Sequence, residues 1–198
     1  MNDLINKNNE AAAAYSADRR GFIKHGLLFS AALGFWTPAL ARADQSAAAP
    51  VKGRTMHLTN VHTTETFKGE YWYDGEYLPD AFSEIKTVLR DYRTNEKFPI
   101  DPRLMDILFV LQNRLKNMAP FDVFSGYRSP ATNAMLRETT NGVARGSLHM
   151  QGQAIDVNLP GTRLSSLQHA AIHLKSGGVG YYPASDFVHV DTGRARNW

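Results

Sequence analysis

The sequence predicts an α+β fold: a small central antiparallel β-sheet with helices packed on one side. Segments with apolar residues at helical spacing and short segments with alternating apolar residues fall into separate runs. This segregation favours α+β over the regular alternation of a parallel α/β sheet. The amino-terminal 43 residues are expected to lie outside the fold, and the remaining 155 of the 198 residues suffice for one domain with one hydrophobic core.

The first 43 residues have the pattern of an export signal. Residues 18–24 (DRRGFIK) resemble a twin-arginine signal, an apolar stretch follows over residues 26–40, and residues 41–43 (ARA) form a small-x-small cleavage site. The alternative is a membrane anchor, but an apolar run of about 15 residues is shorter than the ~20 that span a bilayer as a helix. We therefore predict export to the periplasm by the twin-arginine machinery, cleavage near Ala43, and no stable membrane anchor afterwards.

Without residues 1–43 the net charge of the chain is close to zero, so the charge of the whole chain says little about binding partners. The whole chain has a formal net charge of +3, but residues 44–198 carry 17 Lys and Arg against 16 Asp and Glu. No basic tract suggests nucleic acid as a partner. The chain has no cysteine, which excludes disulfide bonds and thiolate metal sites.

The elements of the domain, expected over residues 54–198, follow from these patterns. An Ala/Ser-rich segment, residues 44–53, precedes the domain and is predicted to be a flexible leader. Alternation over residues 54–77 predicts a β-hairpin or meander. Asp101 at the N-cap with Pro102 at N1 marks a helix start. The predicted helices cover residues 80–93, from 102 to at least 115, 130 to about 139, and 164–175, and the later strands cover 153–159, 178–182 and 187–191.

Two segments that lie far apart in the sequence carry a set of metal-ligating side chains. The segment SLHMQGQAID contains His149 and Asp156, and the later segment DFVHVD contains His189. Because side chains alternate along a strand, neighbouring strands can present Asp156 and His189 on one face, and His149 reaches them from a loop. Two imidazoles and one carboxylate suit a catalytic zinc site with a position left for water, although other divalent ions accept the same ligands.

A second pair of histidines is a weaker candidate. His169 and His173 lie four residues apart on the last predicted helix and share a face, as in His-Glu-x-x-His zinc enzymes. Alanine stands where the general base of those enzymes would be, so we predict no metal role for the pair. His57 and His62 are predicted to be surface or hairpin residues.

The segments SLHMQGQAID and DFVHVD, together with the upstream segment SGYRS (residues 125–129), resemble the signature of the LAS zinc peptidases. That group comprises lysostaphin, the D-Ala-D-Ala metallopeptidases and the hedgehog proteins. Residues 177–183 and 187–198 are most similar to its murein endopeptidases. The resemblance implies a LAS/hedgehog-like domain, one Zn²⁺ per chain held by His149, Asp156 and His189, and hydrolysis of amide bonds in the peptide cross-links of peptidoglycan. Stem peptides of peptidoglycan are then the substrate.

The resemblance also implies a general base. The family carries an acidic residue three positions before the last metal ligand, which assigns this role to Asp186, although many relatives have glutamate there. Asp191 is the alternative, because it shares the face of His189. If it is not the base, Asp191 accepts an imidazole N–H and fixes the tautomer of that histidine.

The same resemblance assigns Arg128 a catalytic role. Its guanidinium matches the arginine that lies over the metal in the D-Ala-D-Ala branch, where it can bind the scissile carbonyl and the oxyanion that develops from it. Ser125, Tyr127 and Tyr182 are candidates for substrate binding, although Tyr127 can equally pack in the core.

Two other functions stay open. One is a D-alanyl-D-alanine carboxypeptidase, which trims a terminal residue instead of cleaving a cross-link. The other is a zinc-containing module that binds peptidoglycan without catalysis, because hedgehog relatives show that this fold can lack peptidase activity. The presence of both Arg128 and an acid at position 186 argues against the second.

Overall fold

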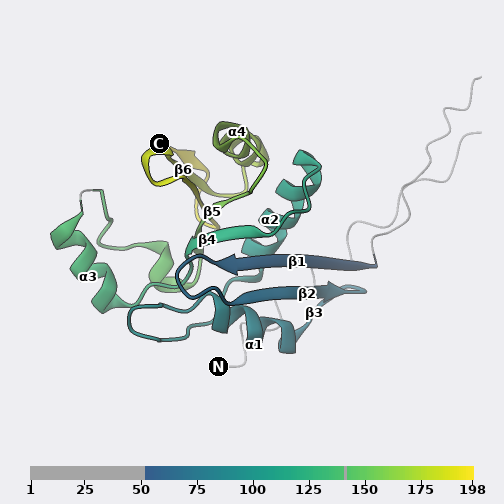
Figure 1. Ribbon diagram of the computed structural model, residues 1–198, viewed down its shortest axis with the longest axis horizontal. Coiled ribbons are helices and arrows are strands. Elements are labelled where there is room, and N and C mark those ends of the chain that lie inside the picture. Colours follow the sequence, from purple (N-terminus) through teal and green to yellow (C-terminus); the bar gives the residue numbers. More distant parts are fainter. Residues whose placement is uncertain (1–51, 141) are drawn as a thin grey trace, which may run out of the picture. The chain divides into compact units, whose positions relative to one another are not determined.

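The computed structural model describes residues 52–140 and 142–198 (Figure 1). The expected signal, residues 1–43, lies outside the described residues, and so does the expected leader apart from residues 52 and 53. Within the described residues, no helix is long and apolar enough to cross a membrane.

An eight-stranded sheet, in the order β3-β2-β1-β4-β5-β7-β6-β8, runs through the described domain. The strands are β1 (Gly53–Asn60), β2 (Thr66–Tyr73), β3 (Glu76–Tyr77), β4 (Phe121–Ser125), β5 (Ala154–Asn158), β6 (Gly178–Tyr182), β7 (Phe187–Asp191) and β8 (Arg196–Asn197). The predictions for β5, β6 and β7 are confirmed to within one residue at each end. Neither β4 nor β8 was expected from the sequence.

The α+β prediction is confirmed with one correction, because the sheet is mixed and not wholly antiparallel. Five neighbouring pairs are antiparallel, but β1 pairs with β4 and β6 pairs with β8 in parallel. After the β1–β2 hairpin the chain passes through two helices and returns beside β1 in the same direction. Parallel neighbours require such a long crossover, and alternation along single strands does not reveal it.

The described residues contain four α-helices, each close to a predicted one: α1 (Pro79–Val88), α2 (Pro102–Leu115), α3 (Pro130–Thr139) and α4 (Leu164–Leu174). The expected cap of α2 is present, because the Asp101 carboxylate accepts the N–H of Arg103 at 3.0 Å. Helix α1 ends five residues earlier than the predicted boundary at residue 93. The Asn60 amide donates to the carbonyl of Val88, and the buried Asp91 accepts the N–H of Arg93, which turns the chain out of the helix.

Three helices cover one face of the sheet, as expected. Tyr71 of β2 packs edge-on against Phe82 of α1 and Phe109 of α2, and α4 packs against α2, β6 and β7. Ile155 and Val157 point into this core and are fully buried. Helix α3 is the exception, because it stands apart from α2 and α4 (Figure 1). Polar side chains of β5 and β7 therefore remain available on the opposite face of the sheet.

Candidate metal centre

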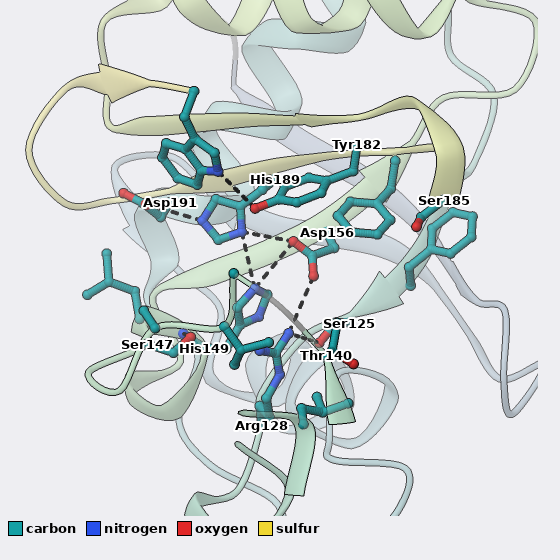
Figure 2. A pocket seen from close by; sticks show the side chains of 18 of the residues that line it. Ser125, Arg128, Thr140, Ser147, His149, Asp156, Tyr182, Ser185, His189 and Asp191 are labelled. Carbon is teal, nitrogen blue, oxygen red and sulfur yellow. Dashed lines mark hydrogen bonds and ion pairs between the residues drawn. The ribbon is translucent and has the colours of Figure 1, made fainter. Parts of the chain in front are cut away.

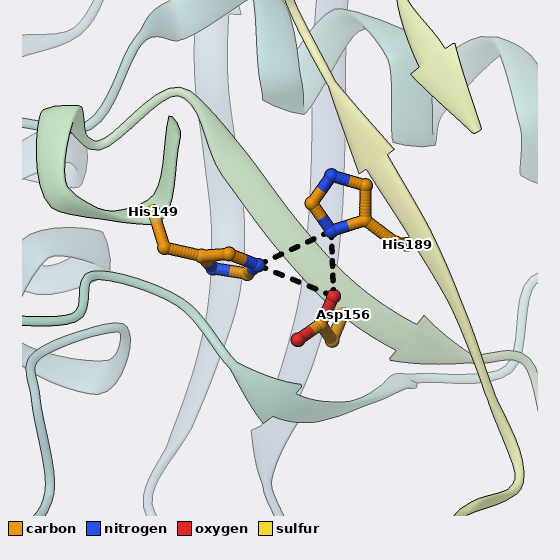
Figure 3. Close-up of side chains that lie close together, drawn as sticks. All are labelled: His149, Asp156 and His189. Atoms are coloured by element: carbon orange, nitrogen blue, oxygen red, sulfur yellow. Dashed lines mark hydrogen bonds and ion pairs between the residues drawn. The ribbon is translucent and has the colours of Figure 1, made fainter. Parts of the chain in front are cut away.

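The three predicted ligands meet on the face of the sheet away from α2 and α4. Asp156 on β5 lies directly opposite His189 on β7, and His149 comes from a short 3₁₀ helix, η1 (Leu148–Gln151). Figure 3 shows the three side chains converging. His149 Nε2 lies 3.2 Å from His189 Nδ1 and 3.3 Å from Asp156 Oδ1, and His189 Nδ1 lies 2.8 Å from Asp156 Oδ1.

These spacings fit a tetrahedral ion. Ligand atoms at about 2.0–2.1 Å from zinc lie roughly 3.3 Å from one another in tetrahedral geometry. Among the described residues, His149, Asp156 and His189 form the one group of His, Cys, Asp or Glu side chains with atoms close enough to hold a metal ion. His169 and His173 are not part of such a group. Instead His173 Nδ1 lies 2.7 Å from the main-chain carbonyl of His169, within the same helix.

Hydrogen bonds orient the two imidazole rings so that each presents a different nitrogen to Asp156. His149 Nδ1 lies 2.8 Å from the carbonyl of Gly126, to which it donates, so that Nε2 faces Asp156. His189 Nε2 lies 3.1 Å from Asp191 Oδ2, so that Nδ1 faces Asp156. The outer nitrogen of each ring therefore keeps its proton, and the inner one is free to bind a cation.

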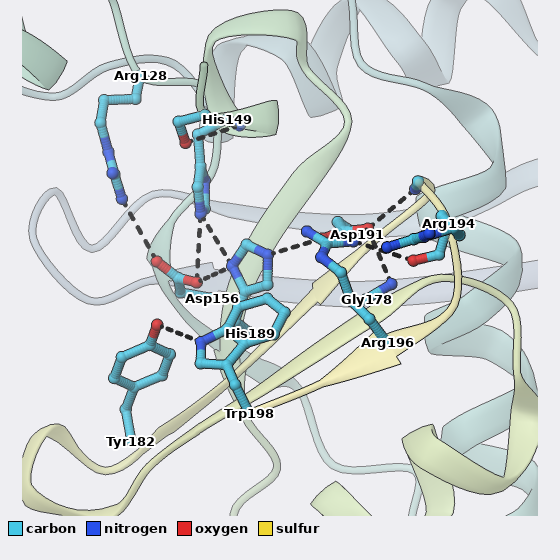
Figure 4. A network of polar contacts seen from close by, with 12 residues as sticks. Arg128, His149, Asp156, Gly178, Tyr182, His189, Asp191, Arg194, Arg196 and Trp198 are labelled. Atoms are coloured by element: carbon cyan, nitrogen blue, oxygen red, sulfur yellow. Dashed lines mark hydrogen bonds and ion pairs between the residues drawn. The ribbon is translucent and has the colours of Figure 1, made fainter. Parts of the chain in front are cut away.

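Asp191 holds the imidazole of His189 in place through this hydrogen bond. Its buried carboxylate also accepts the N–H groups of Gly178 at 2.8 Å and Gly193 at 2.9 Å, and it pairs with Arg196 at 2.7 Å (Figure 4). These contacts engage both of its oxygens. The arrangement matches the alternative role predicted for Asp191, which is to fix the imidazole.

The charges of the centre are strongly coupled. Burial lowers the pKa of His149. Burial also opposes charge on His189, but the contacts with Asp156 and Asp191 outweigh it and raise the pKa of His189 to about 9. Burial would raise the pKa of Asp156, but the two histidines outweigh it and hold that pKa well below its usual range. A proton on His189 thus neutralises Asp156 when no cation is bound, and a metal ion would take the place of that proton.

Asp186 is one of two predicted site residues that do not line the pocket. It follows the short helix η2 (Pro183–Ser185) in a left-handed conformation with φ 56°, and its side chain is exposed. Ser185 and Phe187 line the pocket, whereas Asp186 does not. Burial and the negative charge of Asp186 raise the pKa of Asp122 on β4. Asp122 pairs with Asn158, which lies two residues beyond Asp156 on β5. Asp186 thus lies between two residues that line the pocket, and its role as general base stays a prediction from the resemblance.

Arg128 approaches the centre from the loop between β4 and α3. Its side chain is 13% exposed, and its Nη2 lies 3.6 Å from Asp156 Oδ2 and 3.4 Å from Ser125 Oγ. Its Nε has no hydrogen-bond partner among the described residues. Burial lowers the pKa of Arg128, although Asp156 opposes this effect. A buried guanidinium with uncommitted donors suits an oxygen that carries or develops negative charge.

The centre lies in a cavity of about 530 Å³ (Figure 2). Ser125 and Tyr182 line it, as expected for substrate-binding residues. Tyr127 does not, because it is 7% exposed and stacks on Phe98 with ring centroids 5.0 Å apart. Its predicted place in the pocket is corrected to packing in the core. The cause is local: in the turn after β4, Arg128 faces the cavity and the preceding side chain points the other way.

Several residues that line the cavity could not be identified from local patterns in the sequence. His62 is an exposed residue of the β1–β2 turn, as predicted, but it also lines the cavity, where it stacks on Tyr92 with centroids 3.9 Å apart. Arg196 and Trp198 reach the cavity because β8 pairs with β6. No local pattern predicts that pairing, since β8 has two residues.

Known proteins similar to this chain identify its family. The family model described as Peptidoglycan L,D-endopeptidase MepK, an M15 peptidase family, matches residues 47–198. Peptidoglycan L,D-endopeptidase MepK of Escherichia coli (strain K12) is 40% identical over 184 residues, 93% of this chain and 98% of the relative. The probable peptidoglycan L,D-endopeptidase MepK of Haemophilus influenzae is 39% identical over 148 residues, 74% of this chain and 80% of the relative. The chain belongs to this M15 peptidase family.

Family membership confirms the resemblance to the LAS zinc peptidases and to their murein endopeptidases. Among solved structures, the Serratia marcescens L-Ala D-Glu endopeptidase ChiX is similar over 38% of this chain and 62% of that chain. Its sequence identity is 19% and the TM-score is 0.30.

Proposed function

We propose that this chain is a zinc-dependent peptidoglycan endopeptidase that hydrolyses amide bonds in the peptide cross-links of the cell wall. The observation that carries the proposal is the convergence of His149, Asp156 and His189 beside Arg128 in one cavity. The names of the relatives support the substrate class and favour a bond between an L and a D centre.

Zinc fits the donor set of the centre. His149 Nε2, His189 Nδ1 and Asp156 Oδ1 would hold the ion, because they are the atoms that face one another. A zinc ion with three protein ligands supplies Lewis-acid chemistry, since it polarises a carbonyl and makes water a stronger nucleophile. The hydrogen bonds to Gly126 and Asp191 hold the two rings in the orientation that this binding requires.

Arg128 supplies the charge that the reaction needs beside the metal. Its uncommitted donors bind the oxygen of the scissile carbonyl and stabilise that oxygen as it becomes negative. The low exposure of the side chain strengthens this interaction, because water competes poorly for the guanidinium. A protein that only bound peptidoglycan would gain little from a buried, incompletely paired arginine at this position, which favours catalysis over the binding module.

We further propose that the enzyme acts in the periplasm. Residues 1–43 would form the twin-arginine signal, and a short leader would connect it to the catalytic domain. The expected boundary of that leader at residue 53 is corrected by one residue, because Gly53 already pairs with Tyr73 in the sheet. Peptidoglycan lies outside the cytoplasm, and the family match begins at residue 47, after the proposed cleavage site. The twin-arginine machinery would then be a transient partner, and cleavage near Ala43 would leave no membrane anchor.

Digestion of purified peptidoglycan tests the function directly. Wild-type protein loaded with zinc should convert cross-linked muropeptides to uncross-linked ones, identified by the masses of the fragments. Release of D-alanine without loss of cross-links would support the carboxypeptidase instead. Retention of peptidoglycan without any fragment would support the binding module and overturn the enzyme proposal.

Two variants separate metal binding from catalysis. His189→Ala should lose most zinc and all activity, because one of three ligands is missing. Arg128→Ala should keep its zinc but lower kcat/KM by roughly 100-fold to 1,000-fold, the scale seen when an oxyanion donor is lost. His173→Ala is the matched control and should retain both zinc and activity. Full zinc occupancy in His189→Ala would sink the ligand assignment.

A further inference from the structure

The indole of Trp198 closes one side of the cavity and binds Tyr182. Its Nε1 donates a hydrogen bond to the Tyr182 hydroxyl at 2.8 Å, and its ring lies 5.4 Å from that of His189 (Figure 4). Main-chain bonds hold Trp198 in place: its N–H donates to the carbonyl of Val179, and its carbonyl accepts from Tyr181. These bonds extend the pairing of β8 with β6 by one residue and place the half-exposed indole beside Tyr182.

The neighbouring strand leaves room for this pair. Gly180 of β6 lies opposite His189 of β7. A Cβ atom at Gly180 would approach both the Trp198 and the Tyr182 rings to 2.8 Å, closer than real contacts allow. Because this position has no side chain, the indole can lie beside the His189 ring and still reach the hydroxyl.

The direction of the bond determines what the Tyr182 hydroxyl can do. An indole N–H can only donate, so the hydroxyl oxygen must accept from it and the phenolic proton must point elsewhere. Tyr182 and Arg128 approach Asp156 from opposite sides in both close-up views (Figures 2 and 4). A hydroxyl whose oxygen is already engaged by the indole therefore offers its proton to a ligand bound between these two residues.

We propose that Tyr182 donates a hydrogen bond to the peptide unit that is cleaved, and that Trp198 is the positioning residue that directs this hydroxyl. The proposal rests on the proposed function and extends it to two further residues. Tyr182 acts as a second donor, opposite Arg128, to the oxygen that becomes negative. Trp198 touches no reacting atom, and it acts by excluding the orientation in which the hydroxyl would point away from the substrate.

Steady-state hydrolysis of an isolated cross-linked muropeptide tests both roles. Tyr182→Phe removes the donor and should lower kcat by about 10-fold to 100-fold while KM changes by less than about threefold. Trp198→Phe keeps an aromatic ring but removes the N–H, and it should lower kcat by about 5-fold to 10-fold. Tyr181→Phe, which removes a hydroxyl from the next residue of β6, is the control and should leave kcat unchanged. Zinc content and the unfolding temperature are measured for each variant and should match the wild type.

The double variant Tyr182→Phe/Trp198→Phe distinguishes positioning from a structural role. If Trp198 acts through the hydroxyl, its substitution should have no further effect once that hydroxyl is absent. Multiplying losses, or lost zinc in Trp198→Phe, would mean that the indole supports His189, and would overturn the proposal. Full activity in Tyr182→Phe would overturn it as well.

Failure of the proposed function gives a different result. If wild-type protein binds the muropeptide but does not cleave it, calorimetry on the same variants replaces kinetics. A donor held by Trp198 then predicts weaker binding in both single variants and no further loss in the double variant. Unchanged affinity in Tyr182→Phe would reject the donor even for a binding protein.

Discussion

At the scale of single residues, hydrogen bonds decide what each side chain of the centre can do. His149 and His189 are both histidines, yet one turns Nε2 and the other Nδ1 toward Asp156, because Gly126 and Asp191 engage the opposite nitrogens. Burial lowers the pKa of His149, whereas at His189 the contacts with Asp156 and Asp191 outweigh burial and raise the pKa. The ligand identities could be predicted from spacing, but the choice of ring nitrogen could not.

The base assignment is tested at the same scale. Because Asp186 is exposed and does not line the cavity, Asp186→Asn should keep its zinc and stay within about threefold of wild-type kcat. In Asp191→Asn the amide oxygen would keep the N–H groups of Gly178 and Gly193, so that an NH₂ group, which cannot accept, would face His189. This variant should weaken zinc binding by about 10-fold to 100-fold. Chelator competition and muropeptide hydrolysis measure the two effects. A loss of 100-fold or more in Asp186→Asn with full zinc, on the scale of general-base catalysis, would support the base role of Asp186.

A pH dependence follows from the raised pKa of His189. Without a metal, its folded pKa of about 9 exceeds the ordinary value of 6.5, so protonated His189 stabilises the fold below pH 6.5. That contribution, on the order of 3 kcal/mol, is lost as pH rises through 9. Urea unfolding of chelator-treated wild type and His189→Gln should therefore show a wild-type advantage at pH 6 that shrinks by pH 9. Saturating zinc should abolish this trend, and an advantage that grows with pH would contradict it.

At the scale of elements, the β5–β7 pair and the edge formed by β6 and β8 build the site. Asp156 and His189 face each other because the register of β5 and β7 aligns them, and a shift of one residue would turn His189 toward the core. Strand β6 has no side chain at Gly180, and this space is occupied by the rings of Trp198 and Tyr182 beside the centre. The alternation of β5 and β7 was predictable, whereas the pairing of β8 with β6 depends on contacts distant in sequence.

The space at Gly180 leads to a test. Gly180→Ala should displace the Trp198 or Tyr182 ring and lower muropeptide turnover by about 10-fold, because the added Cβ has no room. Gly69→Ala on β2 is the matched control, since its Cβ would meet Phe67 at an ordinary 3.5 Å. Hydrolysis rates and thermal unfolding are compared for both. Equal activity in the two variants would show that the position tolerates a side chain.

At the scale of the whole molecule, one sheet joins segments from both ends of the described domain. Strand β4 lies between β1 and β5, so the amino-terminal hairpin supports the strand that carries Asp156. The helices on the far face bury the apolar side of that sheet and leave the cavity face to polar and aromatic residues. The export signal lies outside the described residues, and its role remains a prediction from the sequence.

The proposed export route and periplasmic location can be tested in cells. Arg19→Lys combined with Arg20→Lys should block twin-arginine export and leave active enzyme in the cytoplasm, because both positions precede the proposed domain. Fractionation followed by muropeptide hydrolysis locates the activity. A matched Lys7→Arg variant retains the arginine pair and should be exported normally. Undiminished periplasmic activity in the double variant would indicate another export route.

The sequence by itself determined the fold class, the domain helices and which three side chains make up the candidate metal centre, because helical spacing, caps, alternation and motifs are local properties that survive without tertiary contacts. It could not determine that β4 returns parallel to β1, that Tyr127 packs on Phe98, or that Trp198 reaches Tyr182. Each of these depends on how strands distant in sequence pair and which way a loop turns at its end. Only the tertiary structure decides those matters, since the contacts that stabilise one arrangement over another join residues that no local pattern relates.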